Sequence, residues 1–147
     1  MADGHKDYSG TPLWRKLGIR EGARVVLVAA PAGFRGALGT LAPVPDDVRF
    51  LARETKDVDV AVVFTTRLAD LIHRFPALAD ALKPDGRLWI AWPKKASPVT
   101  TDLTFATVQR LGLDSGLVDN KTAAIDEVFQ GCQFVYRLKD RAKVRPR

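Results

Sequence analysis

The sequence predicts a single three-layer α/β domain, built on a mostly parallel sheet of about six strands. Strand-like and helix-like segments alternate along most of the 147 residues. Two segments, 23–30 (ARVVLVAA) and 58–65 (VDVAVVFT), are almost continuously apolar. Such runs are typical of strands that are buried on both faces of a parallel sheet. The hydrophobic content of 46% is ordinary for a domain with its own core.

Composition narrows the class of protein. The single cysteine, Cys132, excludes an internal disulfide framework and a cysteine-based zinc cluster. No apolar run approaches the ~20 residues that a membrane helix needs. Residues 1–7 lack the basic start and apolar centre of a secretory signal. We therefore expect a cytoplasmic protein without a membrane segment, whose oligomeric state the sequence leaves open.

Positive charge is concentrated at the C-terminus. The formal net charge is +6, and residues 137–147 carry six basic residues and one acidic residue. We expect a flexible N-terminal segment at 1–10, one domain at 11–138 and a basic tail at 139–147. Such a tail could contact nucleic-acid phosphates. A tail without interleaved aromatic residues is more often a solvated terminus, so a nucleic-acid partner is not expected.

The N-terminal elements follow from local signals. Residues 11–18 predict a short helix, with Thr11 as its cap, Pro12 in the first position and Gly18 as its end. The strand at 23–30 then enters a glycine-dotted turn.

A short strand is predicted at 48–52. Its link to the next strand, residues 53–57, spans at most ~18 Å when extended. A parallel strand would have to return along the sheet within that reach. We therefore expect either a frayed strand at the sheet edge or an antiparallel one.

A long helix follows the second buried strand. Apolar residues at helical spacing define its inner face: Leu68, Leu71, Ile72 and Phe75. Thr66 is the expected cap, and Pro76 predicts a kink or a break.

Three elements follow that helix. They are a turn at 83–86, a strand at 87–92 and a polar loop at 93–101. A second helix is predicted at 102–111, capped by Asp102 and ended by Gly112.

The chain closes with two strands, at 117–125 and 130–138, that we expect to form an antiparallel hairpin. Cys132 shares a face with apolar residues of the last strand, which predicts a core position.

The chain has two family resemblances. Residues 81–91 (ALKPDGRLWIA) resemble the turn and strand of class I S-adenosylmethionine-dependent methyltransferases. This resemblance implies a Rossmann-like sheet whose last strand runs antiparallel to the rest. Segments 8–13, 16–19, 92–97, 101–103 and 117–121 resemble signatures of a bacterial family of uncharacterised proteins, domain of unknown function 3052. That resemblance implies no settled activity.

The elements that would hold the methyl donor are altered. The turn after the first strand has one glycine, Gly33, and Pro31 removes a backbone N–H. Glu54 is the only acidic residue near the end of the strand predicted at 48–52. One βα unit of the usual seven-stranded sheet is missing. We therefore expect a truncated methyltransferase-like scaffold, and no cofactor is predicted outside the alternative methyltransferase interpretation.

A candidate site is predicted at the carboxyl ends of the parallel strands, where open α/β sheets bind ligands. Its residues combine hydroxyl groups, cations, one indole and one glycine: Gly33, Thr65, Thr66, Arg67, Trp92, Lys94, Lys95 and Ser97. Three cations suit a phosphate or carboxylate and disfavour the cationic sulfonium of a methyl donor.

Catalytic patterns are sparse. Asp119 and Lys121 are two residues apart on one predicted strand, which places them on one face as a proton-transfer pair or as a surface ion pair. His5 and His73 lack ligand-spaced partners, so no metal site is expected.

The leading hypothesis is a non-catalytic binding domain for a small anionic ligand or a partner protein. The alternatives are an S-adenosylmethionine-dependent methyltransferase and a nucleic-acid-associated protein that uses the basic tail.

Overall fold

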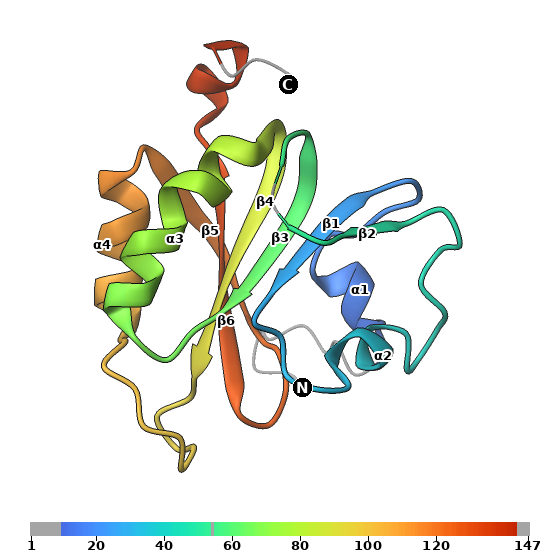
Figure 1. Cartoon of the computed structure of the whole chain (residues 1–147), viewed down its shortest axis with the longest axis horizontal. Helices are drawn as coiled ribbons and strands as arrows, with labels where there is room; N and C mark the ends of the chain where they lie inside the picture. Colours follow the sequence, from blue (N-terminus) through green and yellow to red (C-terminus); the bar gives the residue numbers. More distant parts are fainter. Residues whose placement is uncertain (1–9, 54, 144–147) are drawn as a thin grey trace.

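A computed structural model describes residues 10–53 and 55–143. Six strands form one sheet in the order β2-β1-β3-β4-β6-β5 (Figure 1). Their bounds are β1 Arg24–Val28, β2 Arg49–Leu51, β3 Val58–Phe64, β4 Leu82–Pro93, β5 Leu117–Ala124 and β6 Phe129–Tyr136. Strand β6 runs in the direction opposite to the other five strands of this sheet, because it pairs antiparallel with both β4 and β5. The predicted mostly parallel sheet with a closing hairpin is confirmed.

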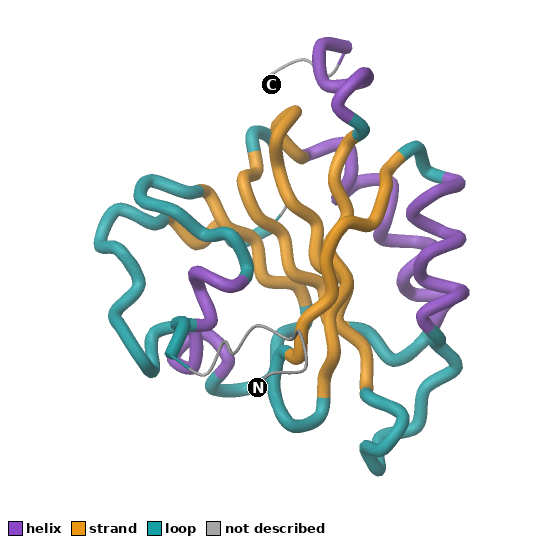
Figure 2. The backbone as a smooth tube through the Cα atoms, turned by 180° about the vertical axis from the view of Figure 1, so that it is seen from behind, coloured by secondary structure: helices purple, strands orange, loops and turns teal. Residues whose placement is uncertain are grey.

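Helices cover both faces of the sheet, which gives three layers (Figures 1 and 2). They are α1 Leu13–Lys16, α2 Phe34–Leu38, α3 Leu68–Ala81 and α4 Phe105–Asp114, and a 3-10 helix, η1 Leu138–Lys143, follows β6. Helices α3 and α4 pack on one face and α1 and α2 on the other. The helix α2 was not expected, because one glycine inside its single turn and one at each end disfavour a helix.

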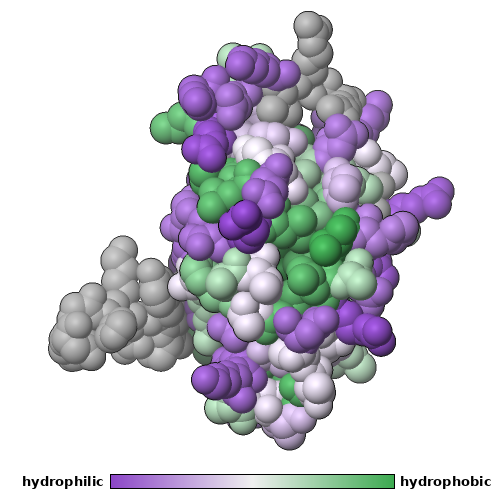
Figure 3. Space-filling view, turned by 90° about the vertical axis from the view of Figure 1, so that its left-hand side faces the viewer, coloured by the Kyte–Doolittle hydropathy of each residue, from purple (hydrophilic) through white to green (hydrophobic). Residues whose placement is uncertain are grey.

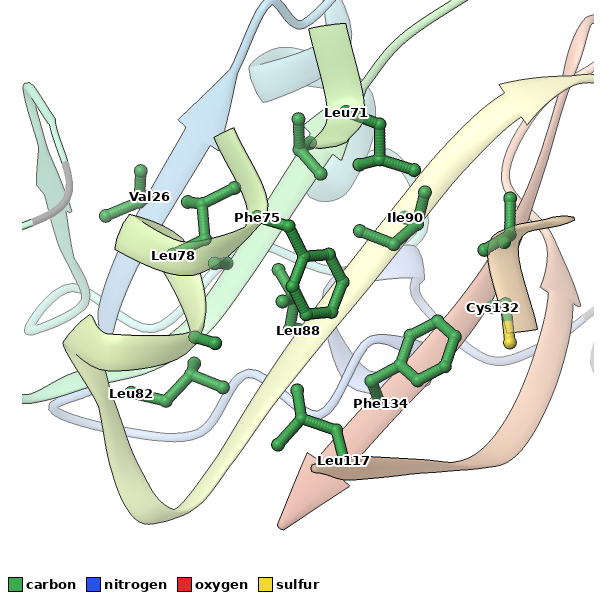
Figure 4. Packing of buried hydrophobic residues seen from close by; sticks show 14 of the residues in the cluster. Val26, Leu71, Phe75, Leu78, Leu82, Leu88, Ile90, Leu117, Cys132 and Phe134 are labelled. Atoms are coloured by element: carbon green, nitrogen blue, oxygen red, sulfur yellow. The ribbon is translucent and has the colours of Figure 1, made fainter. Parts of the chain in front are cut away.

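Two apolar cores lie on opposite sides of the sheet. Under α3 and α4, Phe75 meets Phe134 edge to face with ring centroids 6.1 Å apart (Figure 4). Cys132 is fully buried in this core, as predicted. On the other side, the buried Trp89 indole donates a hydrogen bond to the Leu17 carbonyl over 2.9 Å. This bond fixes α1 against the centre of the sheet.

The edge strand β2 is parallel to β1, so an antiparallel orientation is wrong. Arg49 pairs with Arg24, and Leu51 pairs with Val26. The strand has only three residues and ends at Leu51, so the link to β3 is one residue longer than the predicted 53–57. The short, frayed alternative is therefore the correct one.

Helix α3 differs from its prediction in three details. It runs through Pro76 without a break. Its Ile72 is 51% exposed, in a shallow apolar groove between α3 and α4 (Figure 3). Its N-terminus is capped from outside, because the Leu68 N–H donates to the Asp102 carboxylate over 2.8 Å. Thr66 is therefore not the cap.

The other helix caps also differ from the prediction. The tertiary structure determines which backbone N–H groups each capping side chain can reach. Asp102 serves α3, and α4 is capped by Thr104 and Thr107 in a reciprocal capping box. Helix α1 begins after Pro12, with no side-chain cap from Thr11. Gly18 does end α1 as predicted, with φ +86°.

Gly112 does not end α4 but lies inside it, at the contact with the sheet. A Cβ atom at this position would lie 2.1 Å from Cε1 of Phe134. Gly116, with φ +89°, follows the helix instead. The glycine at 112 therefore lets α4 approach β6. From sequence spacing alone, a glycine with this packing role cannot be distinguished from a glycine that ends a helix.

Two irregularities interrupt the pairing of strands, one in the inner strand β4 and one in the edge strand β5. Val58 pairs with Leu82 but Val60 pairs with Arg87, so residues 83–86 bulge from β4 where a turn was expected. In β5, Asp119 pairs with Phe134 and Lys121 pairs with Gln133, which leaves Asn120 as an extra residue. An extra residue reverses the alternation of faces beyond it.

Candidate functional site

The carboxyl ends of β1, β3 and β4 meet at one edge of the sheet (lower edge in Figure 1). A pocket of about 600 Å³ opens there between the end of β4, the loop 94–104 and the start of α4. It is lined by Trp92, Pro93, Lys94, Lys95, Ser97, Pro98, Val99, Thr100, Thr101, Leu103, Thr104, Phe105 and Gln130. We call it the carboxyl-edge pocket.

The charge of this pocket has one sign. Lys94 and Lys95 contribute two ammonium groups, and no aspartate or glutamate is among the lining residues. Among the described residues, neither lysine has an ion-pair partner. The Lys94 N–H donates to the Val128 carbonyl over 2.7 Å, which anchors the start of the loop to the hairpin. The pocket therefore presents uncompensated positive charge at its rim.

Hydrogen bonds hold the loop 94–104 in place. The Ser97 N–H donates to the Lys94 carbonyl over 2.9 Å, and the Ser97 hydroxyl accepts from the Val99 N–H over 3.0 Å. The Thr101 hydroxyl donates to the Thr66 carbonyl over 2.7 Å. Together with the Asp102 cap on Leu68, these bonds tie the pocket wall to the junction of β3 and α3.

The remaining lining is largely apolar. Trp92 and Leu103 are buried, whereas Phe105 and Val99 are 41% and 40% exposed. Gln130 is the cross-strand partner of Trp92, and its amide donates to the Pro93 carbonyl over 3.3 Å. The pocket thus combines a cationic rim with apolar walls.

The eight predicted site residues divide into three groups. Trp92, Lys94, Lys95 and Ser97 line the carboxyl-edge pocket. The neighbouring segment 65–67 supports the loop through its backbone without lining the pocket. Gly33 lies apart, at the start of α2.

The segment 65–67 offers less to a ligand than expected. The Thr65 hydroxyl donates to the Arg67 carbonyl over 3.1 Å and accepts from the Arg67 N–H over 3.3 Å. Thr66 presents its carbonyl to the loop, and the Arg67 side chain is exposed. These contacts stabilise the turn into α3.

Sequence reasoning missed Leu103, Phe105 and Gln130. Gln130 is the second residue of β6, and strand pairing brings it beside Trp92. Phe105 falls within the helix predicted at 102–111, where the sequence pattern gives it a structural role. The sequence did contain one signal for Phe105. It is an aromatic residue near the start of a helix, directly after a loop expected to form the site.

The described residues do not fit the nucleoside of a methyl donor at the usual place. The turn from β1 to α2 contains Pro31 and one glycine, Gly33, with φ +84°. Nothing lies within 4 Å of a Cβ placed on Gly33, so no close protein approach requires this glycine. After β2 come Ala52 and Arg53, which offer no carboxylate for ribose hydroxyls. Glu54, the predicted acidic candidate, lies outside the described residues.

Asp119 and Lys121, the pair considered for proton transfer, have separate partners. Asp119 accepts from Gln109 of α4, whereas Lys121 donates to the carbonyl of Lys16, the last residue of α1. The extra residue Asn120 puts these two side chains on opposite faces, so the predicted pair on one face is wrong. Burial, together with Asp119, raises the pKa of the Cys132 thiol to about 12.

The described residues lack two further features, a metal-binding cluster and a membrane-spanning helix. No group of three or more histidine, cysteine, aspartate or glutamate side chains is arranged to hold a metal ion. No helix in the described part of the chain has the length and apolar character to cross a membrane. His5 and residues 144–147 of the basic tail lie outside the described residues, and residues 138–143 form η1.

Comparison with solved structures defines the class of fold. The pyocyanin biosynthetic protein PhzM matches with a TM-score of 0.61 and 11% identity, over 88% of this chain and 54% of its own. The magnesium protoporphyrin IX methyltransferase ChlM from Synechocystis PCC 6803, with bound SAH, matches with a TM-score of 0.56 and 11% identity, over 85% and 78%. The mitomycin 7-O-methyltransferase MmcR matches with a TM-score of 0.54 and 14% identity, over 90% and 51%. The chain thus spans about half of the length of MmcR.

The fold is that of the class I S-adenosylmethionine-dependent methyltransferases, which confirms the fold-level resemblance. At 10–14% identity the likeness shows the fold alone. No protein-family model and no curated protein matches the sequence. The resemblance to the uncharacterised bacterial family therefore stays an expectation.

Proposed function

We propose that this chain is a non-catalytic binding domain for a small organic anion that has an apolar part. The observation that carries the proposal is the lining of the carboxyl-edge pocket: within the described part of the chain, its two lysines have no ion-pair partner and no acidic residue lines it. A carboxylate or phosphate between Lys94, Lys95 and Ser97 would gain charge-assisted hydrogen bonds. Its apolar part would lie against Val99, Leu103 and Phe105.

A binding role is favoured over catalysis by what the pocket lacks. Its described lining contains no histidine, cysteine, aspartate or glutamate. These are the side chains that most often exchange protons or attack substrates near neutral pH. Lysine is the only titratable type present, and both lysines sit at the rim.

The proposal is tested by calorimetric titration of benzoate and naphthoate into wild-type protein and a Lys94→Gln, Lys95→Gln variant. We expect naphthoate to bind more tightly than benzoate, because it covers more of the apolar wall. We expect the double variant to lose at least about tenfold in affinity, since each lost charge-assisted bond is worth about 1.5–3 kcal/mol. An Arg74→Gln, Lys139→Gln variant removes the same charge from exposed positions and serves as the control.

Two results would remove this function. One is that neither anion binds. The other is that the two double variants bind alike, which would mean that net charge and not this pocket attracts the anion. If instead a partner protein uses this rim, the same lysine variant loses the partner while no small anion binds.

The fold favours a second candidate, an S-adenosylmethionine-dependent methyltransferase, because one structural neighbour, ChlM, was solved both with bound SAM and with bound SAH. Calorimetry with S-adenosylmethionine and S-adenosylhomocysteine separates the two functions. Micromolar binding of either compound would make methyl transfer the better account. Deletion of 139–147 tests the nucleic-acid alternative, which predicts that any RNA or DNA binding is lost with the tail.

A further inference from the structure

A second pocket, of about 410 Å³, opens at the opposite edge of the sheet, where the parallel strands begin (upper edge in Figure 1). Its charged lining includes Arg20, Glu21, Lys83, Asp85, Arg87 and Arg141. We call it the amino-edge pocket. The proposed carboxyl-edge function does not use any of these residues.

Three departures from regular structure meet at this pocket. Residues 83–86 bulge from β4, and Asn120 is the extra residue in β5. Gly18 adopts φ +86° at the end of α1. Bulges occur preferentially next to binding sites, where they redirect side chains. Here they surround one side chain, that of Arg87.

Arg87 is held in place from two sides. Its Nη1 donates to Oε1 of the buried Gln133 over 3.3 Å, and the Gln133 amide in turn donates to Oδ1 of Asn120 over 2.8 Å. A Cβ at position 18 would lie 2.5 Å from Cδ of Arg87, so the side chain packs directly on the Gly18 backbone. The guanidinium is thereby positioned before any ligand arrives, which lowers the entropic cost of binding.

The charges around Arg87 are not balanced by a direct partner. Lys83 forms an ion pair with Asp59 over 3.0 Å, which leaves Arg20, Arg87 and Arg141 as the other cations of the pocket. No carboxylate of the described residues lies within ion-pair distance of the Arg87 guanidinium. Burial lowers the pKa of Arg87, and Arg20 and Arg141 lower it further while Asp85 opposes them. Three guanidinium groups that repel one another would be stabilised by an anion.

We propose that the amino-edge pocket binds a single phosphate group, as free phosphate or as a small phosphomonoester, with Arg87 as its principal ligand. The planar guanidinium can donate two parallel hydrogen bonds to phosphate oxygens. Arg20 and Arg141 add charge at the rim. The exposed carboxylates of Glu21 and Asp85 lie at the same rim and would repel an extended polyanion, which favours a small ligand over nucleic acid.

The test is calorimetric titration with inorganic phosphate and with methyl phosphate, at constant ionic strength. We expect Arg87→Gln to weaken phosphate binding about tenfold or more, because it removes a bidentate charged contact. Arg20→Gln changes an exposed side chain and keeps the fold, and it should weaken binding severalfold. Arg74→Gln, on the outer face of α3, should leave binding unchanged.

The outcomes distinguish this site from the carboxyl-edge pocket. The Lys94→Gln, Lys95→Gln variant should bind phosphate like the wild type even though it loses naphthoate. The proposal would be overturned if about 10 mM phosphate showed no binding. That result would mean a binding free energy weaker than about 3 kcal/mol. The proposal would also be overturned by equal affinities in wild type, Arg20→Gln and Arg87→Gln, or by an oligonucleotide that displaces phosphate through the same arginines. Tighter binding of methyl phosphate than of inorganic phosphate would identify an ester as the ligand.

Discussion

Replacement of Asp102 by alanine tests how the site is built into the fold. The Asp102 carboxylate accepts from the Leu68 N–H over 2.8 Å and so caps α3 from the loop that forms the pocket wall. Loss of an N-cap costs about 0.5–2 kcal/mol, and loss of the negative charge at the helix N-terminus adds about 0.3–1 kcal/mol. We expect the free energy of unfolding to fall by about 1–2 kcal/mol. For a chain of this length that lowers the melting temperature by about 2–6 °C.

The assay is urea denaturation followed by circular dichroism, with naphthoate titration of the same variant. Asp102→Asn should recover most of the stability, because asparagine is an equally good cap. Asp114→Ala is the matched control, since its exposed ion pair with Arg110 over 3.4 Å is worth at most about 0.5 kcal/mol. An Asp102→Ala protein as stable as the Asp114→Ala protein would refute the reasoning, because the loop would then not be anchored through this carboxylate.

Two further predictions concern the core. Gly112→Ala should destabilise the protein by about 1–3 kcal/mol in urea denaturation, because the alanine Cβ would overlap the buried Phe134 ring. This overlap outweighs the ~1 kcal/mol gain in helix propensity. A variant more stable than the wild type would show that α4 can move away from β6. Burial raises the pKa of the Cys132 thiol from 9.0 to about 12. Between these two pH values the unfolded chain has lost the thiol proton while the folded chain still holds it. The free energy of unfolding should therefore fall as the pH rises from about 9 towards 12. Native protein should therefore resist alkylation at pH 8, and a Cys132→Ala variant should show a shallower alkaline loss of stability; rapid alkylation without unfolding would contradict the buried position.

The regular part of the fold follows from simple sequence patterns. The strands β1 and β3 are apolar runs, and the spacing of Leu71 and Phe75 marks the buried face of α3. These signals are local and strong, because an apolar run has few alternatives to burial. The short link before β3 also placed β2 at the edge of the sheet.

The irregular part could not be predicted because it depends on tertiary contacts. Asp102 and Thr104 are both good caps, and only the packing of α3 against the loop decides which helix each one serves. Gly112 has the residue type of a helix end but serves a close approach to Phe134. The extra residue Asn120 leaves no mark in the β5 sequence, yet it separates Asp119 from Lys121.

The candidate site shows the same division. Trp92, Lys94, Lys95 and Ser97 come from one continuous segment, so the end of β4 brings them together without any knowledge of topology. Gly33 and the segment 65–67 follow other strands, and whether they join the same pocket depends on loop conformations. The amino-edge pocket was not anticipated, because Arg87 gains its neighbours from a bulge, a hairpin and a helix that lie far apart in sequence.

The most direct test of the binding account is an amide chemical-shift titration of the labelled protein with naphthoate and, separately, with S-adenosylhomocysteine. The account predicts that naphthoate shifts the amides of residues 94–104, and that S-adenosylhomocysteine leaves the amides of residues 29–35 unchanged. Saturable shifts at Gly33 and its neighbours with S-adenosylhomocysteine, and none along the loop with naphthoate, would contradict it.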